Sequence, residues 1–244
     1  MAVKIGSARI DENKKAKGGK AGDQTGNEVS TQNWYKHSKG WIVLRPISTE
    51  IGEKLAYDMQ AACNNNNIGY DQGQRLTLYN IAKSVDFDCA KVKEKCETDC
   101  SALVRVCCAY AGIMVSNFRT TNEASVLMAT GKFIKLTDKK YTDSSDYLMR
   151  GDILVTRTQG HTVIVLNNGK YAPEIPIDTT NAHVLVTVKS VWVRAGAGIE
   201  YPAISVAYKG DMFDYLNETE NNFYKIKYKE TYAYISKNCS KLTI

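Results

Sequence analysis

Residues 49–63 carry the hydrophobic spacing of an amphipathic helix. The apolar positions that fall on one face are Ile51, Leu55, Met59 and Ala62. Thr49 is a suitable N-terminal cap, and the asparagine run at 64–67 marks the end of the pattern. A second helix is predicted at about 71–84, where apolar residues again recur with helical spacing.

The stretch 98–112, TDCSALVRVCCAYAG, gives the strongest helix prediction in the chain. Thr98 or Asp99 can cap its start, and Gly112 can end it. The residues predicted for its buried side are Leu103, Val106, Cys107 and Tyr110. A further helix and a turn are predicted at 121–136.

The hydrophobic period shortens to that of strands from Asp152 onward. Short β-branched strands are predicted in DILVTR and in HTVIVL, and Asn168–Gly169 closes the second. Because helices come first and strands follow, the first part of the chain is predicted to be an α+β domain.

Pro173 and Pro176 mark a break, and almost everything beyond residue 182 reads as short strands separated by turns. These strand segments are VLVTV, VWVRAG, AISVAY, DMFDYL, FYKIKY and TYAYIS. Such spacing predicts a small all-β barrel. We therefore expect a first domain at 1–180, which opens with an irregular, glycine- and lysine-rich lead-in at 1–29, and a second domain at 182–244.

The composition is that of an ordinary globular protein, with a formal net charge of +6. A basic surface favours polyanions, but no recognition helix, zinc-finger spacing or aromatic–basic RNA motif is present, so nucleic acid is not an expected partner. The chain has no apolar run that would predict membrane insertion or a secretory signal. We expect the protein to be made in the cytoplasm without a signal peptide. Its oligomeric state does not follow from the sequence.

Seven cysteines, an odd number in a chain without a signal sequence, predict mostly reduced thiols. No histidine lies between Cys63 and Cys108, although a zinc site would need one nearby or a second cysteine pair. No metal and no other cofactor is expected.

Cys100 lies in the first turn of the helix predicted at 98–112, where unpaired backbone N–H groups stabilise a thiolate. Cys107 and Cys108 lie two turns further along and are predicted to belong to the core. The best base among the three histidines is His161, which opens a strand in the same domain. The alternative is that Cys100 is a packed thiol and His161 a structural histidine.

The segments TDCSALV and RGDILVT, followed by GHTVIVLNNG, resemble the NlpC-type cysteine peptidases, papain-like cell-wall hydrolases related to the CHAP amidases. Ala102 stands where that family has glycine. The upstream segments GDQTGNEV, WIVLRP and IGYDQGQRLTLY resemble the N-terminal parts of phage and prophage endolysins. The resemblance covers roughly residues 20–170. It implies a papain-like NlpC/CHAP-type fold, Cys100 as nucleophile and His161 as base.

In this family a third polar residue on the next strand orients the histidine. The chain departs from that pattern, because the expected slot falls at Pro173 or its neighbours. Glu174 or Asn167 is a candidate, an N-terminal residue is another, and a bare dyad is an alternative. The N-terminal candidates are Asp23, Gln24 and Glu28. The resemblance also assigns substrate binding to Tyr70, as the tyrosine of the family's cleft, and to Asp99 and Ser101 beside the nucleophile.

Residues 182–244 resemble the bacterial SH3-like wall-binding module, through VWVRAGAG, VAYKGDMFDYL and FYKIKYKETYAYIS. Lys225, Lys227 and Lys229 alternate along one predicted strand, so their side chains are predicted to share one face. An acidic wall polymer is the expected partner of this face. The alternative is a barrel that only packs on the first domain.

Together these features predict a phage-type endolysin, a thiol hydrolase released to act on the bacterial cell wall. The predicted partner is peptidoglycan, and the predicted reaction cuts an amide of its stem peptide through a thioester. An endopeptidase cut next to D-glutamate is favoured, and an N-acetylmuramoyl-L-alanine amidase is the alternative. A zinc amidase and a non-catalytic wall-binding phage protein are the readings from other classes.

Overall fold

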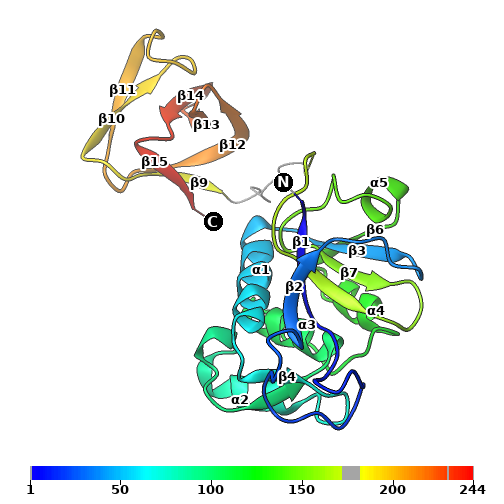
Figure 1. Cartoon of the computed structure of the whole chain (residues 1–244). Helices are drawn as coiled ribbons and strands as arrows, with labels where there is room; N and C mark the ends of the chain where they lie inside the picture. The colour runs from blue at the N-terminus through cyan, green and yellow to red at the C-terminus, as the bar shows by residue number, and fades with distance from the viewer. Residues whose placement is uncertain (1, 172–181, 230, 244) are drawn as a thin grey trace. The chain divides into compact units, whose positions relative to one another are not determined.

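A computed structural model describes residues 2–171, 182–229 and 231–243 of the chain (Figure 1). The chain divides into two compact units, Met1–Ile175 and Pro176–Ile244. Within the described residues, no helix has the length and apolarity needed to cross a membrane. The two units are considered separately below.

Unit 1 is built around a six-stranded sheet with the order β2-β1-β8-β7-β3-β6, in which every neighbouring pair is antiparallel. Its strands are β1 (Lys4–Ala8), β2 (Val29–Asn33), β3 (Trp41–Pro46), β6 (Phe133–Leu136), β7 (Ile153–Thr156) and β8 (Thr162–Val165). A separate parallel pair joins β4 (Ile68–Tyr70) to β5 (Cys96–Thr98). Strand β5 leads directly into the helix that begins at Cys100.

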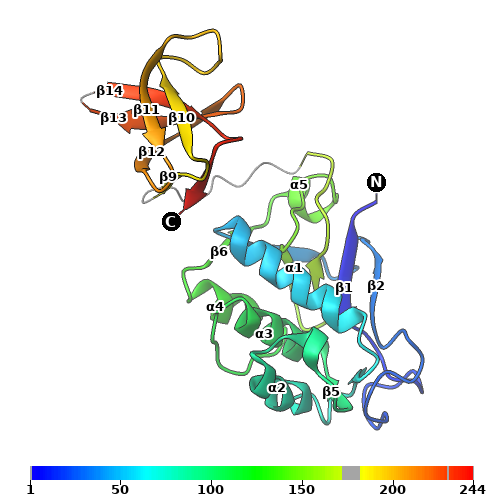
Figure 2. The ribbon, with the colours of Figure 1, turned by 90° about the vertical axis from the view of Figure 1, so that its left-hand side faces the viewer.

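The helices of unit 1 are α1 (Thr49–Cys63), α2 (Thr77–Ala82), α3 (Cys100–Tyr110), α4 (Glu123–Met128) and α5 (Lys139–Thr142), with 3-10 turns at Lys83–Val85 and Cys89–Lys91. Helix α1 has the predicted bounds, but its cap is Ser48, whose hydroxyl accepts from the N–H of Ile51 at 3.2 Å. Helices α1 and α3 pack on one face of the sheet and on each other (Figure 2).

The two faces of the sheet bury separate sets of side chains, as period-two alternation requires. Ile153 and Val155 of β7 point into the larger core, which also contains Leu55 of α1 and Leu103 of α3. Leu154, between them, points to the opposite face and joins a smaller core that includes Trp41. The sheet is therefore covered on both sides, by the helices on one and by aromatic loop residues on the other.

The prediction that residues 1–29 form an irregular lead-in is wrong for its first part, because β1 lies in the interior of the sheet between β2 and β8. Strands β1, β2 and β3 all precede the first helix, so the predicted order of helices before strands is also wrong. A side-chain carbon on Gly6 would lie 2.7 Å from Cγ of Met59. Only glycine therefore lets β1 approach α1 this closely.

Other predicted helices differ in their bounds. The helix predicted at 71–84 begins only at Thr77, because the preceding residues form turns around the Asp71 carboxylate. The segment 121–136 contains α4, as predicted, but it ends in strand β6 at the edge of the sheet. Helix α3 and strands β7 and β8 lie where the sequence predicts them.

Unit 2 is an all-β unit whose seven strands follow the order β11-β10-β14-β13-β12-β9-β15. The strands are β9 (His183–Val186), β10 (Ser190–Arg194), β11 (Ala203–Tyr208), β12 (Met212–Glu220), β13 (Phe223–Tyr228), β14 (Thr231–Ser236) and β15 (Ser240–Thr243). Six of these confirm predicted strands, and β15 adds a seventh. Their inward side chains, among them Val193 and Ile226, form one small core.

Candidate functional site

Cys100 is the first residue of helix α3, and Asp99 is the N-cap. The Asp99 carboxylate accepts hydrogen bonds from the N–H of Ala102 at 2.7 Å and from the hydroxyl of Ser101 at 2.9 Å. Asp99 therefore fixes the start of the helix that carries the thiol. Asp99 and Ser101 were predicted to bind substrate, but their described contacts are within the protein.

Arg75 holds this helix start from the other side. Its guanidinium forms a buried ion pair with Asp99 and donates to the hydroxyl of Ser101 at 2.9 Å and to the carbonyl of Phe118 at 2.8 Å. A third hydrogen bond reaches Asn117. The sequence analysis missed Arg75, because no local pattern connects it to a residue 24 positions later.

The Cys100 thiol is buried, with 8% of the residue exposed. Burial raises its pKa to about 12, and the charges of Asp99 and Glu123 add to the rise, while the backbone N–H groups of Thr162 and Ser101 act in the opposite direction. In this structure the thiol is therefore protonated near neutral pH. The prediction that the helix start lowers the pKa is wrong here, because desolvation outweighs the helix dipole.

His161 lies immediately before β8, and its backbone N–H donates to the hydroxyl of Thr156 at 3.0 Å. Its ring Nε2 lies 3.2 Å from the hydroxyl oxygen of Ser7. Burial lowers the pKa of His161 to about 4, and the charges of His37 and Arg9 lower it further. His161 is therefore a neutral imidazole at ordinary pH.

Thr162, the residue after His161, connects the histidine strand to the thiol. Its backbone N–H lowers the pKa of the Cys100 thiol, and its hydroxyl donates to the Glu123 carboxyl at 2.6 Å. Burial raises the pKa of Glu123 to about 8, so this carboxyl is mostly protonated at pH 7. Helix α3 packs against β8. The structure thus brings Cys100 and Thr162, the first residue of β8, together from positions 62 residues apart in the sequence.

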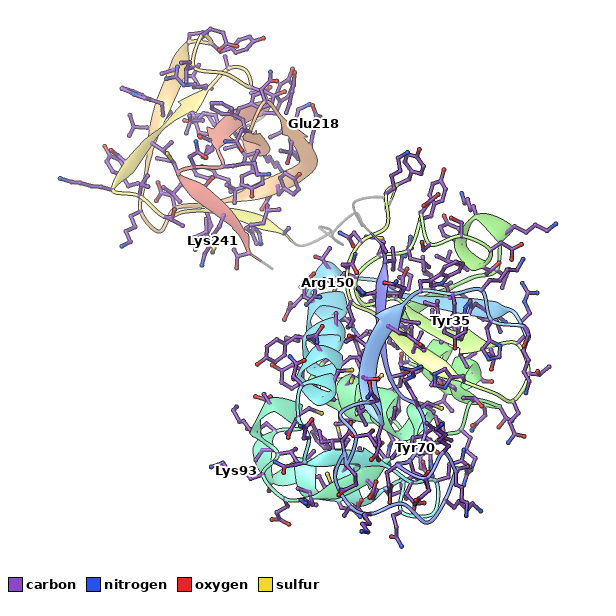
Figure 3. The ribbon with its side chains drawn as sticks, viewed as in Figure 1. Tyr35, Tyr70, Lys93, Arg150, Glu218 and Lys241 are labelled. Carbon is purple, nitrogen blue, oxygen red and sulfur yellow. The ribbon has the colours of Figure 1, made fainter. Side chains whose placement is uncertain are left out.

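A surface pocket of about 470 Å³ opens beside His161. It is lined by Arg9, Ile10, Gln32, Tyr35 and His161. Burial raises the pKa of the Tyr35 hydroxyl, Arg9 opposes the rise, and a Cys100 thiolate would add to it. Tyr35, labelled in Figure 3, therefore lies within electrostatic range of the thiol as well as in the wall of the pocket.

Tyr70 ends strand β4 and is buried, with its hydroxyl accepting from Gln72 at 3.0 Å. Burial raises its pKa to about 12, and the charges of Cys100 and Asp99 contribute. Tyr70 thus lies near the nucleophile helix, as Tyr35 does. Its place as a substrate-binding residue stays a prediction.

Of the two residues named first for orienting His161, only Asn167 is described, and its hydrogen bonds do not reach the ring. Asn167 lies beyond the opposite end of β8, where its amide bonds to the backbone of Lys4 and Ala2. Glu174 lies outside the described residues.

The N-terminal candidates bond to groups other than His161. Asp23 and Glu28 accept backbone hydrogen bonds within the 22–29 loop, and Glu28 also accepts from the N–H of Tyr70 at 3.1 Å. Gln24 donates to the carbonyls of Ala21 and Gly22. Among the described residues, the partner of the His161 ring nitrogen is Ser7, which comes from the stretch predicted to be irregular.

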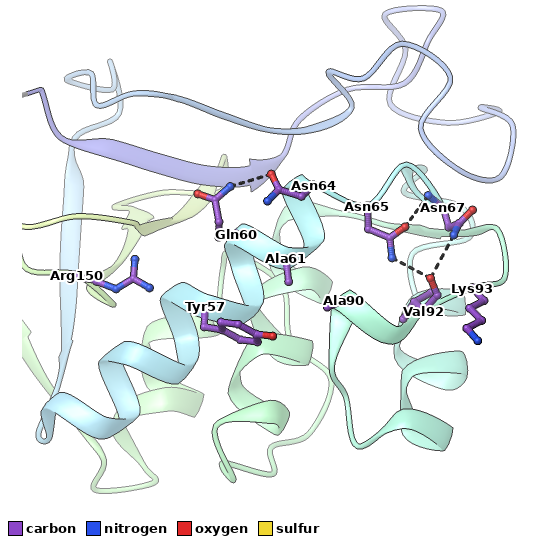
Figure 4. A pocket seen from close by; sticks show the side chains of 10 residues that line it. All are labelled: Tyr57, Gln60, Ala61, Asn64, Asn65, Asn67, Ala90, Val92, Lys93 and Arg150. Atoms are coloured by element: carbon purple, nitrogen blue, oxygen red, sulfur yellow. Dashed lines mark hydrogen bonds between the residues drawn. The ribbon is translucent and has the colours of Figure 1, made fainter.

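A larger hollow of about 570 Å³ lies elsewhere on unit 1, along helix α1 (Figure 4). Its lining consists of Tyr57, Gln60, Ala61, Asn64, Asn65, Asn67, Ala90, Val92, Lys93 and Arg150. The amides of Asn65 and Asn67 donate to the carbonyl of Val92 and so brace the wall. None of the predicted site residues lines this hollow.

All seven cysteines are free thiols, as predicted. Among the residues that the structure describes, no three histidine, cysteine, aspartate or glutamate side chains are arranged as a ready metal site.

One face of unit 2 combines aromatic and cationic side chains. Lys225 and Lys227 of β13 pair with Tyr234 and Tyr232 of β14, so all four project from the same side of the sheet. The Lys225 ammonium lies 4.3 Å from the centre of the Tyr232 ring and 2.7 Å from a Glu218 oxygen. The prediction that Lys225, Lys227 and Lys229 share one face is therefore wrong for Lys229.

Lys229 does not share this face as a strand residue. It follows the end of β13 and has a φ of 54°, which is left-handed backbone. The basic stripe is thus shorter than predicted, and it is flanked on β10 and β11 by exposed Trp192 and Tyr208.

Comparison with known proteins now identifies the two units. A family model described as an endolysin-like domain matches residues 5–172, and one described as a bacterial SH3 domain matches residues 189–241. The chain belongs to the endolysin-like domain family. Its resemblance to an endolysin with a C-terminal SH3-like domain is thereby confirmed. None of the curated proteins compared with the chain matches it.

Membership indicates a cell-wall hydrolase whose partner is peptidoglycan. The matched region of the endolysin-like domain includes Ser7, Cys100 and His161. The match to the SH3 domain includes the lysine and tyrosine face of β13 and β14.

Proposed function

We propose that this endolysin-like protein hydrolyses an amide bond in the stem peptide of peptidoglycan, with Cys100 as nucleophile and His161 as base. The observation that carries the proposal is that the start of helix α3 and the start of strand β8 come together at the Cys100 sulfur. Cys100 begins helix α3, which packs against β8, and the backbone N–H of Thr162, next to His161, lowers the pKa of the Cys100 thiol. A papain-like arrangement of helix and strand would have this geometry.

In the proposed reaction, the Cys100 sulfur attacks the scissile carbonyl while its proton passes to His161. The tetrahedral intermediate then collapses, the C–N bond breaks, and His161 returns the proton to the leaving amine. Water adds to the resulting thioester, with His161 again taking a proton, and the acid product leaves with the thiol restored. No metal or external oxidant is needed for this balance.

The protonation states of the free protein suit proton transfer during the attack. A thiol with a pKa of about 12 and a histidine with a pKa of about 4 rest as a neutral pair. Substrate that enters the pocket would meet a neutral base already oriented through Nε2 by Ser7. This leaves Nδ1 as the atom proposed to accept the thiol proton.

The oxyanion of the tetrahedral intermediate is proposed to bind at the start of α3. Asp99 already accepts the N–H of Ala102, so the N–H groups of Cys100 and Ser101 remain as the proposed donors. Arg75 supports this arrangement without touching substrate, because it holds both Asp99 and Ser101.

The scissile bond that we favour is the amide next to D-glutamate. The pocket beside His161 contains the Arg9 guanidinium, and guanidinium groups recognise carboxylates through paired hydrogen bonds. A D-glutamyl residue offers such a carboxylate near the scissile amide. Cleavage of the muramoyl–L-alanine amide is the second candidate. Mass spectrometry of digested wall fragments separates the two, because only the amidase leaves glycan with free lactyl groups.

Unit 2 is proposed to hold the enzyme on its insoluble substrate through the face of β13 and β14. Tethering raises the local concentration of the enzyme at the wall without any new catalytic contact. Residues 1–180 alone should then hydrolyse soluble muropeptides but clear intact walls poorly. Equal clearing of whole walls by the truncated and full-length proteins would leave the barrel with a structural role only.

The deciding experiment measures clearing of purified walls by wild type, Cys100→Ala and His161→Ala. Both variants should lose about a thousandfold or more of the activity. Full activity of Cys100→Ala would refute the thiol mechanism. Full binding to walls with no hydrolysis by the wild type would favour a non-catalytic wall-binding protein. Loss of activity with chelator and its return with zinc would favour a zinc amidase.

A further inference from the structure

The loop between β1 and β2 gathers acidic residues against strands β4 and β5. Glu97 is the central residue of β5, opposite Gly69 of β4. Asp11, Glu28 and Asp71 are buried beside it, and Glu12 is half-buried. The loop is fixed there by backbone contacts, because the N–H of Gly22 donates to the carbonyl of Cys96 and that of Asp23 to the carbonyl of Asn66.

Glu97 has no partner for its charge. Only 3% of the residue is exposed, and neither carboxylate oxygen has a hydrogen-bond partner among the described residues. Oδ2 of Asp11 is buried and unpartnered as well. Buried carboxylate oxygens are normally hydrogen-bonded or paired, so three such atoms in one cluster require an explanation.

The negative charges of the other carboxylates in the cluster act on Glu97. Burial raises the pKa of Glu97 to about 8, and the charges of Glu28, Asp71, Glu12 and Asp11 all raise it further, in that order. No described salt bridge connects any of the five to a lysine or arginine, although the 14–20 stretch is rich in lysine.

Protonation of Glu97 alone does not satisfy these buried carboxylate oxygens. A protonated Glu97 would carry one O–H donor. Three buried carboxylate oxygens lack a described partner, so a single proton leaves at least one of them unsatisfied. A bulky cationic group of a substrate does not fit either, because both oxygens are shielded from solvent. A bare cation satisfies the charge and the empty lone pairs together.

We propose that the cluster around Glu97 and Asp11 binds one calcium ion. Calcium takes six to eight oxygen ligands in flexible geometry and accepts main-chain carbonyls among them. Because no three acidic side chains form a ready metal site, backbone oxygens and water would complete the shell. Magnesium suits the site less, since it requires strict octahedral geometry and retains its water.

Main-chain oxygens lie at the right place, and one of them, the carbonyl oxygen of Gly22, also accepts from the Gln24 amide at 2.8 Å. A side-chain carbon on Gly69 would meet both Oε2 of Glu97, at 2.9 Å, and the carbonyl oxygen of Gly22. One on Gly19 would lie 3.0 Å from Oε2 of Glu12 and 3.1 Å from the carbonyl oxygen of Tyr70. Glycine at these two positions therefore leaves room for oxygens to converge from the loop and from β4.

The site would link calcium to the candidate active site through the backbone. Strand β5 continues through Thr98 and Asp99 into Cys100, and Tyr70 ends the partner strand. A bound ion would fasten the 11–28 loop to both strands and so stabilise the start of α3. The proposal concerns binding and stability, and it stands whether or not Cys100 is the nucleophile.

The test of this proposal uses calcium as the only added ligand. The full-length protein is first freed of metal by a chelator. Calorimetric titration should show one saturable site, and thermal unfolding should shift upward with calcium. Magnesium should bind at least about tenfold more weakly. Glu97→Gln should abolish the calcium response, while Glu53→Gln, an exposed carboxylate paired with Arg150, should keep it in full.

The variant also has an expected effect of its own. In chelator above pH 8, Glu97→Gln should unfold at a higher temperature than wild type, because there it removes a buried charge that the neighbouring carboxylates repel. Asp11→Asn is a second variant and should weaken calcium binding about tenfold or more. Absence of saturable binding, an unchanged response in Glu97→Gln, or equal affinity for magnesium would overturn the proposal.

The result is separable from the proposed catalysis. Cys100→Ala should bind calcium as wild type does, because the thiol is not part of the cluster. Calcium binding without wall hydrolysis would refute only the proposed function, and hydrolysis without calcium binding would refute only the calcium site.

Discussion

The Nε2 atom of His161 lies 3.2 Å from the hydroxyl oxygen of Ser7, across two adjacent antiparallel strands of one sheet. Ser7 is 1% exposed, so this hydrogen bond is shielded from water. A buried partner on one ring nitrogen fixes the tautomer and the plane of the imidazole, and it leaves the other nitrogen for the thiol. In the proposed mechanism Ser7 would take the orienting role for which the sequence analysis named Glu174 and Asn167.

Ser7→Ala should lower kcat/KM on a soluble muropeptide about fivefold to tenfold, since one neutral hydrogen bond contributes about 1 kcal/mol. The loss should fall mainly on kcat, because Ser7 positions the base and does not contact substrate. Ser84→Ala, an exposed serine on the 3-10 turn after α2, is the control and should be silent. A change in KM alone would argue against the positioning role.

The pH profile of kcat/KM should extend far into the acid range. The working form of His161 is neutral, and burial lowers its pKa from 6.5 to about 4. Activity should therefore persist below pH 6.5 and fall as the pH drops through about 4. Rates measured on soluble fragments avoid effects of pH on wall binding. An acid limb centred near 6.5 would mean that His161 is solvated in the working enzyme.

Arg75→Leu should destabilise the protein by about 3–5 kcal/mol, because it leaves the buried Asp99 carboxylate without its charge partner. The matched control is Arg150→Leu, which breaks the more exposed pair with Glu53 and should cost about 0–1 kcal/mol. Denaturant unfolding monitored by tryptophan fluorescence gives both values. Similar losses in the two variants would contradict the bracing role of Arg75.

The stability of the calcium-free protein should fall as the pH rises from about 4.5 to about 8. The pKa of Glu97 is about 8 in the folded chain and ordinarily 4.5, so the folded state binds more protons in this window. Stability contributed by the protonated form is complete below 4.5 and is lost as the pH passes 8. Glu97→Gln should flatten this part of the pH–stability curve in chelator. An identical curve for wild type and variant would contradict the prediction.

Reversing one charge on the barrel should weaken attachment to walls. Lys227→Glu changes the aromatic and cationic face of β13 and β14 and should reduce pelleting with walls about threefold or more at low salt. Lys241→Glu, the same change on β15, is the control. High salt should narrow the difference, because it screens exposed charges. Equal loss in both variants would indicate attraction by net charge alone.

The sequence by itself determined the elements whose signal is local. The apolar spacing of 49–63 and the capped start of α3 predicted those helices, and short β-branched runs between turn residues predicted β7, β8 and six strands of the barrel. It also selected Cys100 and His161, because a thiol at a helix start and a histidine at a strand start are features of neighbouring residues. These patterns need no knowledge of distant contacts.

Only the tertiary structure decided the rest. Strand β1 is five residues long and contains Gly6, so its place inside the sheet depends on pairing with β8, far along the chain. Ser7 meets His161 across a separation of 154 residues, and the charge of Asp11 acts on Glu97 across a separation of 86. The protonation states also follow from burial: the helix start favours a thiolate at Cys100, but removal of water around the sulfur outweighs it. Desolvation is set by everything packed around a group, and therefore no local stretch of sequence encodes it.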